Sequence, residues 1–115
     1  MSPRRFHVGK RLSEMAVHDG TVYLAGQVPD DVTQDIRGQT AQVLAMVDRL
    51  LAEAGSERSR ILMAQIYLAD LADFDGMNAV WDDWVAPGHA PPRATVQARL
   101  ADPGWKIEIV VTAAT

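Results

Sequence analysis

Apolar and polar residues alternate near the start of the chain, where two strand-forming runs flank the dipeptide Asp19-Gly20. Asp-Gly is a strong two-residue hairpin turn, because both positions tolerate positive φ angles. Residues 14–29 (EMAVHDGTVYLAGQVP) are therefore predicted to form a β-hairpin. The preceding residues 4–8 (RRFHV) indicate a further short strand.

The pattern then changes to helical spacing in two segments. Between Ile36 and Ala54, apolar residues recur every three or four positions, which predicts an amphipathic helix that ends at Gly55. A second helix is expected within residues 73–85 (DFDGMNAVWDDWV), closed by Pro87. Its apolar stripe is expected to lie in the core and consists of Phe74, Met77, Trp81, Trp84 and Val85.

Three strands complete the pattern. Residues 60–70 (RILMAQIYLAD) are apolar on both faces of the pleat, which suits a strand covered on both sides. Residues 93–100 (RATVQARL) and 106–115 (KIEIVVTAAT) follow, joined by the turn sequence DPGW. The order of elements predicts one α+β domain over residues 1–115, with two helices packed on one face of a sheet. An apolar second face would need a cover, for which a second copy of the chain is the simplest candidate.

Composition narrows the classes of function. The net charge is −4 and the isoelectric point about 5.2, which argues against a nucleic-acid-binding protein. The chain has no cysteine, no apolar run long enough for a membrane span and no secretory signal pattern, so we expect a cytoplasmic protein. No phosphate-binding loop is present, and His7, His18 and His89 share no metal-ligand spacing. We therefore expect neither a metal nor a cofactor.

Two charged residues stand at unusual positions in strands. Arg93 follows Pro91 and Pro92 and opens a strand, and Glu108 lies between Ile107 and Ile109. A carboxylate within an apolar strand either faces solvent or has a partner. By alternation, Glu108 shares a face with Val110 and Thr112, and Arg93 shares one with Thr95 and Gln97. The pattern leaves three interpretations: a structural Arg93–Glu108 ion pair, two unrelated surface charges, or a functional site.

Six segments together resemble the RidA (YjgF) family, and within it the YoaB-like branch. In chain order they are YLAGQVPDD, QTAQVL, LLAEAGS, IYLADLADFDGMNAVWDDWV, HAPPRATVQARL and KIEIVVTAA. The resemblance runs from about residue 14 to the C-terminus. It implies a chorismate-mutase-like mixed sheet with two helices on one face. It also implies a homotrimer whose sheets line a central barrel, with a cleft between neighbouring subunits.

The resemblance also implies an activity and a site. The well-studied branch of the family hydrolyses enamines and imines, such as 2-aminoacrylate and 2-iminobutyrate, to 2-keto acids and ammonia. Arg93 matches the arginine that grips the substrate carboxylate, and Glu108 matches the carboxylate that holds a water near the imine carbon. The backbone at Gly26 and Thr95 matches positions that bind the ligand, and Asn78 matches an asparagine that lines the cleft. The implied ligand is a small carboxylate-bearing imine, enamine or 2-keto acid.

Three positions depart from the family pattern. Thr95 stands where many members have cysteine, Ala25 replaces a serine, and Leu12 replaces an aromatic residue that often covers the substrate. These departures concern the choice of substrate more than the class of reaction. A non-catalytic trimer that senses 2-keto acids is the alternative function, since Arg93 alone would suffice to hold a carboxylate. A ribonuclease fits poorly with an acidic chain.

Overall fold

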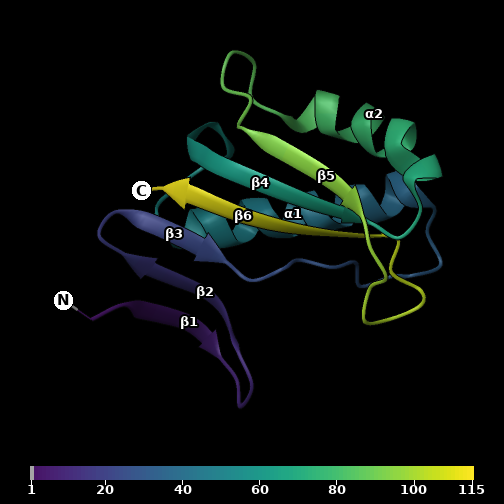
Figure 1. Cartoon of the computed structure of the whole chain (residues 1–115). Helices are drawn as coiled ribbons and strands as arrows, with labels where there is room; N and C mark the ends of the chain where they lie inside the picture. Colours follow the sequence, from purple (N-terminus) through teal and green to yellow (C-terminus); the bar gives the residue numbers. More distant parts are fainter. Residues whose placement is uncertain (1) are drawn as a thin grey trace.

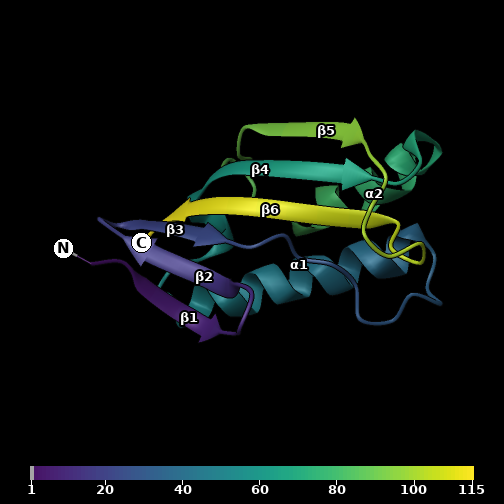
Figure 2. The same ribbon diagram turned by 60° about the horizontal axis from the view of Figure 1, so that its bottom comes forward.

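A computed structural model describes residues 2–115 and shows a six-stranded β-sheet with two α-helices on one of its faces (Figure 1). Figure 2 shows α1 lying beneath the sheet. The α-helices are α1 (Ile36–Glu53) and α2 (Phe74–Trp84), and short 3-10 turns span Arg58–Arg60 and Leu71–Asp73. The strands are β1 (Arg4–Val8), β2 (Ser13–His18), β3 (Thr21–Leu24), β4 (Ile61–Leu68), β5 (Arg93–Gln97) and β6 (Ile107–Ala114).

The strands lie in the order β1-β2-β3-β6-β4-β5, and only the β4–β5 pair is parallel. This confirms the predicted α+β order, with α2 as the crossover between the two parallel strands. The hairpin turn is also confirmed, since Asp19 and Gly20 have φ angles of 50° and 75°. The strand expected over residues 93–100 is shorter, because β5 ends at Gln97. The DPGW turn joins β5 to β6, but β4 lies between the two strands.

The two edge strands of the sheet differ in how well they are protected against pairing with a further strand. β1 forms one edge, carries Arg4 and Arg5, and contains His7 at a φ angle of 53°, between the paired residues Phe6 and Val8. β5 forms the other edge, and after Arg93 it has no charged residue. Both edges leave backbone hydrogen-bonding groups without a partner strand in this chain.

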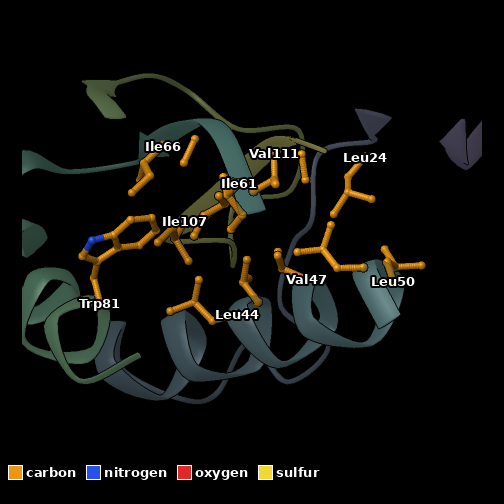
Figure 3. Close-up of a cluster of buried hydrophobic side chains, with 14 of the residues drawn as sticks. Leu24, Leu44, Val47, Leu50, Ile61, Ile66, Trp81, Ile107 and Val111 are labelled. Carbon is orange, nitrogen blue, oxygen red and sulfur yellow. The ribbon is translucent and has the colours of Figure 1, made fainter. Parts of the chain in front are cut away.

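The core lies between the sheet and the two helices, as the close-up in Figure 3 shows. Leu44, Val47 and Leu50 project from α1 towards the sheet, where Ile107 and Val111 are buried with them. The Asp35 side chain caps α1 by accepting a hydrogen bond from the Gly38 N–H at 3.0 Å. Gly55 follows the helix with a φ of 76°, as its predicted stop position requires. No helix within residues 2–115 has the length and apolarity needed to cross a bilayer.

One expectation about burial is wrong. Phe74 was expected in the core, but it is the first residue of α2 and remains 39% exposed.

The strand over residues 60–70 was expected to be covered on both sides. Within residues 2–115 the helices cover one face of β4, and the cover of its other face stays a prediction. We call that side of the sheet the open face. It carries Tyr23, Met63, Tyr67, Val96, Glu108, Val110 and Thr112.

The open face is partly apolar. Tyr23, Met63 and Val96 are exposed at 52%, 38% and 44% respectively. They come from β3, β4 and β5, so apolar surface extends from β3 to the β5 edge of the sheet. A face of this kind is typical of a surface that another protein covers.

The side chain of Gln39, on α1, forms hydrogen bonds to the backbone of two loops. These bonds lead to a prediction about stability. Its side chain is fully buried, and its Nε2 donates to the Gly104 carbonyl at 3.1 Å and to the Gln34 carbonyl at 3.2 Å. Its Oε1 accepts from the Lys106 N–H at 2.8 Å. Gln39→Leu leaves these backbone groups buried without partners, so the free energy of unfolding should fall by about 2–3 kcal/mol.

Urea denaturation measures this loss, with Arg49→Gln as the control. Arg49 is an exposed residue of the same helix, and its side chain makes no hydrogen bond within the part of the chain that the structure describes. Its replacement should change the free energy of unfolding by less than about 0.5 kcal/mol. Equal denaturation midpoints for Gln39→Leu and the unmodified protein would show that Gln39 does not hold the loops.

Candidate functional site

Arg93 opens β5, and its side chain lies on the helix face of the sheet. It is paired in register with the buried Ala64 of β4. Its Nη1 donates to the Asn78 Oδ1 at 2.8 Å and lies 4.0 Å from the Met77 sulfur. Pro91 and Pro92 restrict the backbone immediately before it. The structure therefore brings Arg93 and Asn78 together, as the sequence analysis expected of two residues of one site.

Two aromatic rings complete the surroundings of Arg93. The Cζ atom lies 5.1 Å from the centroid of the Trp81 ring and 5.9 Å from that of Phe74. We call Arg93, Asn78, Trp81, Phe74 and Met77 the arginine cluster. Sequence analysis assigned the three apolar members to the core alone. Their positions on one face of α2, together with Asn78, were the signal that could have placed them beside a site residue.

The guanidinium of the arginine cluster lacks a carboxylate partner. Within residues 2–115, the ion pairs join His7 to Glu53, His18 to Asp19 and Arg58 to Asp48, and none includes Arg93. Burial lowers the pKa of Arg93 below its ordinary value, and the Asp82 carboxylate opposes that change. Arginine nevertheless stays charged at any physiological pH. A half-buried cation with free N–H groups is suited to bind an anion.

Glu108 lies on the open face, next to Gly26. Its face is set by the register with Tyr67 and by the burial of its neighbours Ile107 and Ile109. A Cβ atom at Gly26 would overlap the Glu108 Oε2 and lie 2.9 Å from its Cδ. The close approach of the carboxylate therefore requires glycine at this position. We call Gly26 and Glu108 the carboxylate cluster.

Thr95 lies on the helix face, two residues after Arg93. Its Oγ1 is buried and has no hydrogen-bond partner within residues 2–115. The carbonyl of Pro92 and the N–H of Ala98 both bond to β4. Because backbone groups alternate in direction along a strand, the N–H and C=O of Thr95 point to the free edge of the sheet. They are placed where a ligand or a second chain could reach them.

The two clusters occupy opposite faces of the sheet. Arg93 and Thr95 share the helix face with Ala64 and Ile66, whereas Glu108 shares the open face with Tyr67. A structural Arg93–Glu108 ion pair within one chain, one of the interpretations left open by the sequence, is therefore wrong. The predicted faces of both residues are confirmed. Among residues 2–115, no three His, Cys, Asp or Glu side chains are grouped as metal ligands would be.

Comparison with known proteins identifies the family. The family model described as "Endoribonuclease L-PSP" matches residues 3–115. A RutC family protein of Haemophilus ducreyi is 54% identical over 110 residues, which cover 96% of this chain and 94% of the relative. The chain belongs to the YjgF/RidA family. The RutC family protein YoaB of Escherichia coli is 46% identical, with 96% of each chain covered.

Solved structures of the YjgF/RidA family share the fold described above. The crystal structure of a YjgF family member from Neisseria meningitidis has a TM-score of 0.97 and 47% sequence identity. The match covers 100% of this chain and 96% of that one. The six-stranded mixed sheet with two helices is thus the fold of this family. The family resemblance seen in the sequence is confirmed, including its relation to YoaB.

Proposed function

We propose that this protein hydrolyses small reactive 2-imino acids, formed from enamines such as 2-aminoacrylate, to 2-keto acids and ammonia. The observation that carries the proposal is the guanidinium of Arg93, which is half-buried and has no carboxylate partner among residues 2–115. Such a group can bind a substrate carboxylate through two parallel N–H donors. Membership of the Rid family supports the same reaction, because many of its members are enamine deaminases.

The site is proposed to form between two copies of the chain in a homotrimer. Arg93, Asn78 and Thr95 would come from one copy, and Gly26 and Glu108 from its neighbour. The placement of the two clusters on opposite faces supports this arrangement, because one chain alone does not bring them together. The exposed apolar residues of the open face give a second copy something to cover.

The chemistry follows from the groups in the two clusters. The enamine first tautomerises to the imine, and water then adds to C2. A C–O bond forms, the water gives up a proton, and the imine nitrogen gains one. The resulting carbinolamine loses ammonia as the C–N bond breaks and the C2 carbonyl forms. Glu108 would orient the water and accept its proton, while Arg93 holds the carboxylate, so that the reactants meet in a fixed geometry.

Turnover tests the proposal directly. A serine/threonine dehydratase generates 2-aminoacrylate or 2-iminobutyrate in solution, and the loss of imine is followed by trapping with semicarbazide. The protein should accelerate the release of 2-keto acid. Glu108→Gln should slow it by about 10²-fold or more, because glutamine keeps the shape of the side chain but cannot accept a proton.

Calorimetric titration with 2-oxobutyrate supplies the control for Glu108→Gln. Binding should stay within a fewfold of that of the unmodified protein, since Arg93 is intact. Unchanged turnover in Glu108→Gln would show that the carboxylate has no part in the reaction. Binding of 2-oxobutyrate without any turnover by the unmodified protein would support the sensor function instead.

A further inference from the structure

Trp81 has two environments, one in the core and one at the proposed site. The residue is only 5% exposed, and Figure 3 shows its ring directed from α2 towards Ile107 of the sheet. The same ring centroid lies 5.1 Å from the Cζ atom of Arg93. A single side chain thus connects the packed interior to the one arginine that the proposed reaction uses.

The contacts of Arg93 restrain it from several directions. The Trp81 and Phe74 rings lie at cation–π distances of 5.1 and 5.9 Å, and Asn78 accepts a hydrogen bond at 2.8 Å. Asn78 lies four positions after Phe74 along α2, and Trp81 lies three positions after Asn78, so the three residues share one face of the helix. A free arginine side chain has considerable rotamer entropy, and its loss on ligand binding weakens affinity. Here much of that entropy is already lost before a ligand arrives.

We propose that Trp81 is a positioning residue: its ring holds the guanidinium of Arg93 in the orientation that binds the substrate carboxylate. This inference rests on the proposed function, in which Arg93 binds that carboxylate. The desolvated ring face strengthens the attraction to the cation. Asn78 takes up one Nη1 donor, so the N–H groups at the remaining edge are left to form paired hydrogen bonds with a planar carboxylate.

The expected effect is on binding rather than on the chemical step. The carboxylate is held both in the bound substrate and in the transition state, so loss of its orientation should raise KM and leave kcat nearly unchanged. A purely structural role of Trp81 would instead lower stability and the fraction of active protein, which reduces the apparent kcat.

Three variants separate these roles. Trp81→Leu keeps an apolar side chain but has no ring, whereas Trp81→Phe keeps a smaller ring that can face the cation. Trp84→Leu is the matched control: the Trp84 ring packs against that of Trp81 at 5.4 Å between centroids, but it covers a different arginine, Arg58, at 4.9 Å. We expect KM to rise about tenfold in Trp81→Leu, about threefold or less in Trp81→Phe, and to stay within about twofold in Trp84→Leu. Thermal unfolding of all three variants records the loss of stability separately.

A spectroscopic measurement tests the same contact without any turnover. The Nε–H resonance of Arg93, assigned by its absence in Arg93→Lys, should be shifted upfield by the Trp81 ring, and this shift should disappear in Trp81→Leu and largely persist in Trp81→Phe. An unchanged resonance and an unchanged KM in Trp81→Leu would overturn the inference. So would equal rises of KM in the leucine and phenylalanine variants. Absence of turnover in the unmodified protein would refute the proposed function instead, and the resonance would still decide whether Trp81 orients Arg93.

Discussion

Replacement of Arg93 by alanine is expected to lower kcat/KM for imine hydrolysis by about 10²–10⁴-fold. The substrate carboxylate would lose two charge-assisted hydrogen bonds, each worth about 1.5–3 kcal/mol. Arg93→Lys should recover little of the activity, because an ammonium group cannot present two parallel donors or lie flat against the Trp81 ring. The measurement is the rate of 2-keto acid release with the imine generated in solution.

Arg99→Ala is the control for this loss. Arg99 is an exposed arginine just beyond β5, and within residues 2–115 its side chain has no recorded hydrogen bond or ion pair. Its replacement should leave kcat/KM within about twofold of the parent value. The Arg93 variants should also keep their secondary structure, measured by circular dichroism. Activity in Arg93→Lys equal to that of the unmodified protein would refute the role of Arg93 as a two-donor clamp.

Mixing two inactive variants is expected to restore activity. In a site built from two copies, an Arg93→Ala chain still supplies Glu108, and a Glu108→Gln chain still supplies Arg93. Random assembly of equal amounts places both intact residues in about a quarter of the sites. Unfolding and refolding the two variants together should therefore give about a quarter of the activity of the unmodified protein, whereas each variant refolded alone should keep about a hundredth of it or less.

A double variant makes this experiment decisive. Chains with both substitutions, refolded with either single variant, supply only one of the two residues and should restore nothing. Light scattering of the refolded samples should give a trimer, three times the 12.6 kDa mass of the chain. No recovery in the mixture of single variants, or a stable monomer in solution, would show that the site is not shared between copies.

Much of the fold could be predicted from the sequence, because its local signals agree with one another. The Asp19-Gly20 turn and the helical spacing from Ile36 onwards each specify one backbone geometry. The position of β6 between β3 and β4 could not be read from the chain, because strand pairing depends on packing between distant residues. The end of β5 was placed too late for a related reason. β4 ends at Leu68, whose carbonyl accepts the Ala98 N–H, so Arg99 and Leu100 lie beyond the strand with which β5 pairs.

The candidate site was predicted only in part. The alternation of side chains along each strand correctly grouped Arg93 and Glu108 with the residues on their own faces. It does not show which face of one strand lies on the same side of the sheet as a given face of another. The register of β4 with both β5 and β6 was needed to show that the two residues are on opposite faces. Trp81 was assigned to the core, which is correct for most of its surface. Its contact with Arg93 depends on the position of α2 against the edge strand.

The unequal edges of the sheet have a consequence for solubility. β1 carries two arginines and an irregular backbone at His7, features that discourage another strand from pairing with it. From Ala94 to Gln97, β5 contains the β-forming residues Thr95 and Val96, no charge and no proline. A chain released from an assembly would therefore expose an edge with which other chains can pair. Substitutions that weaken contacts between copies would therefore promote aggregation through β5. A lysine at Val96, exposed on the open face, would then reduce aggregation without repairing assembly.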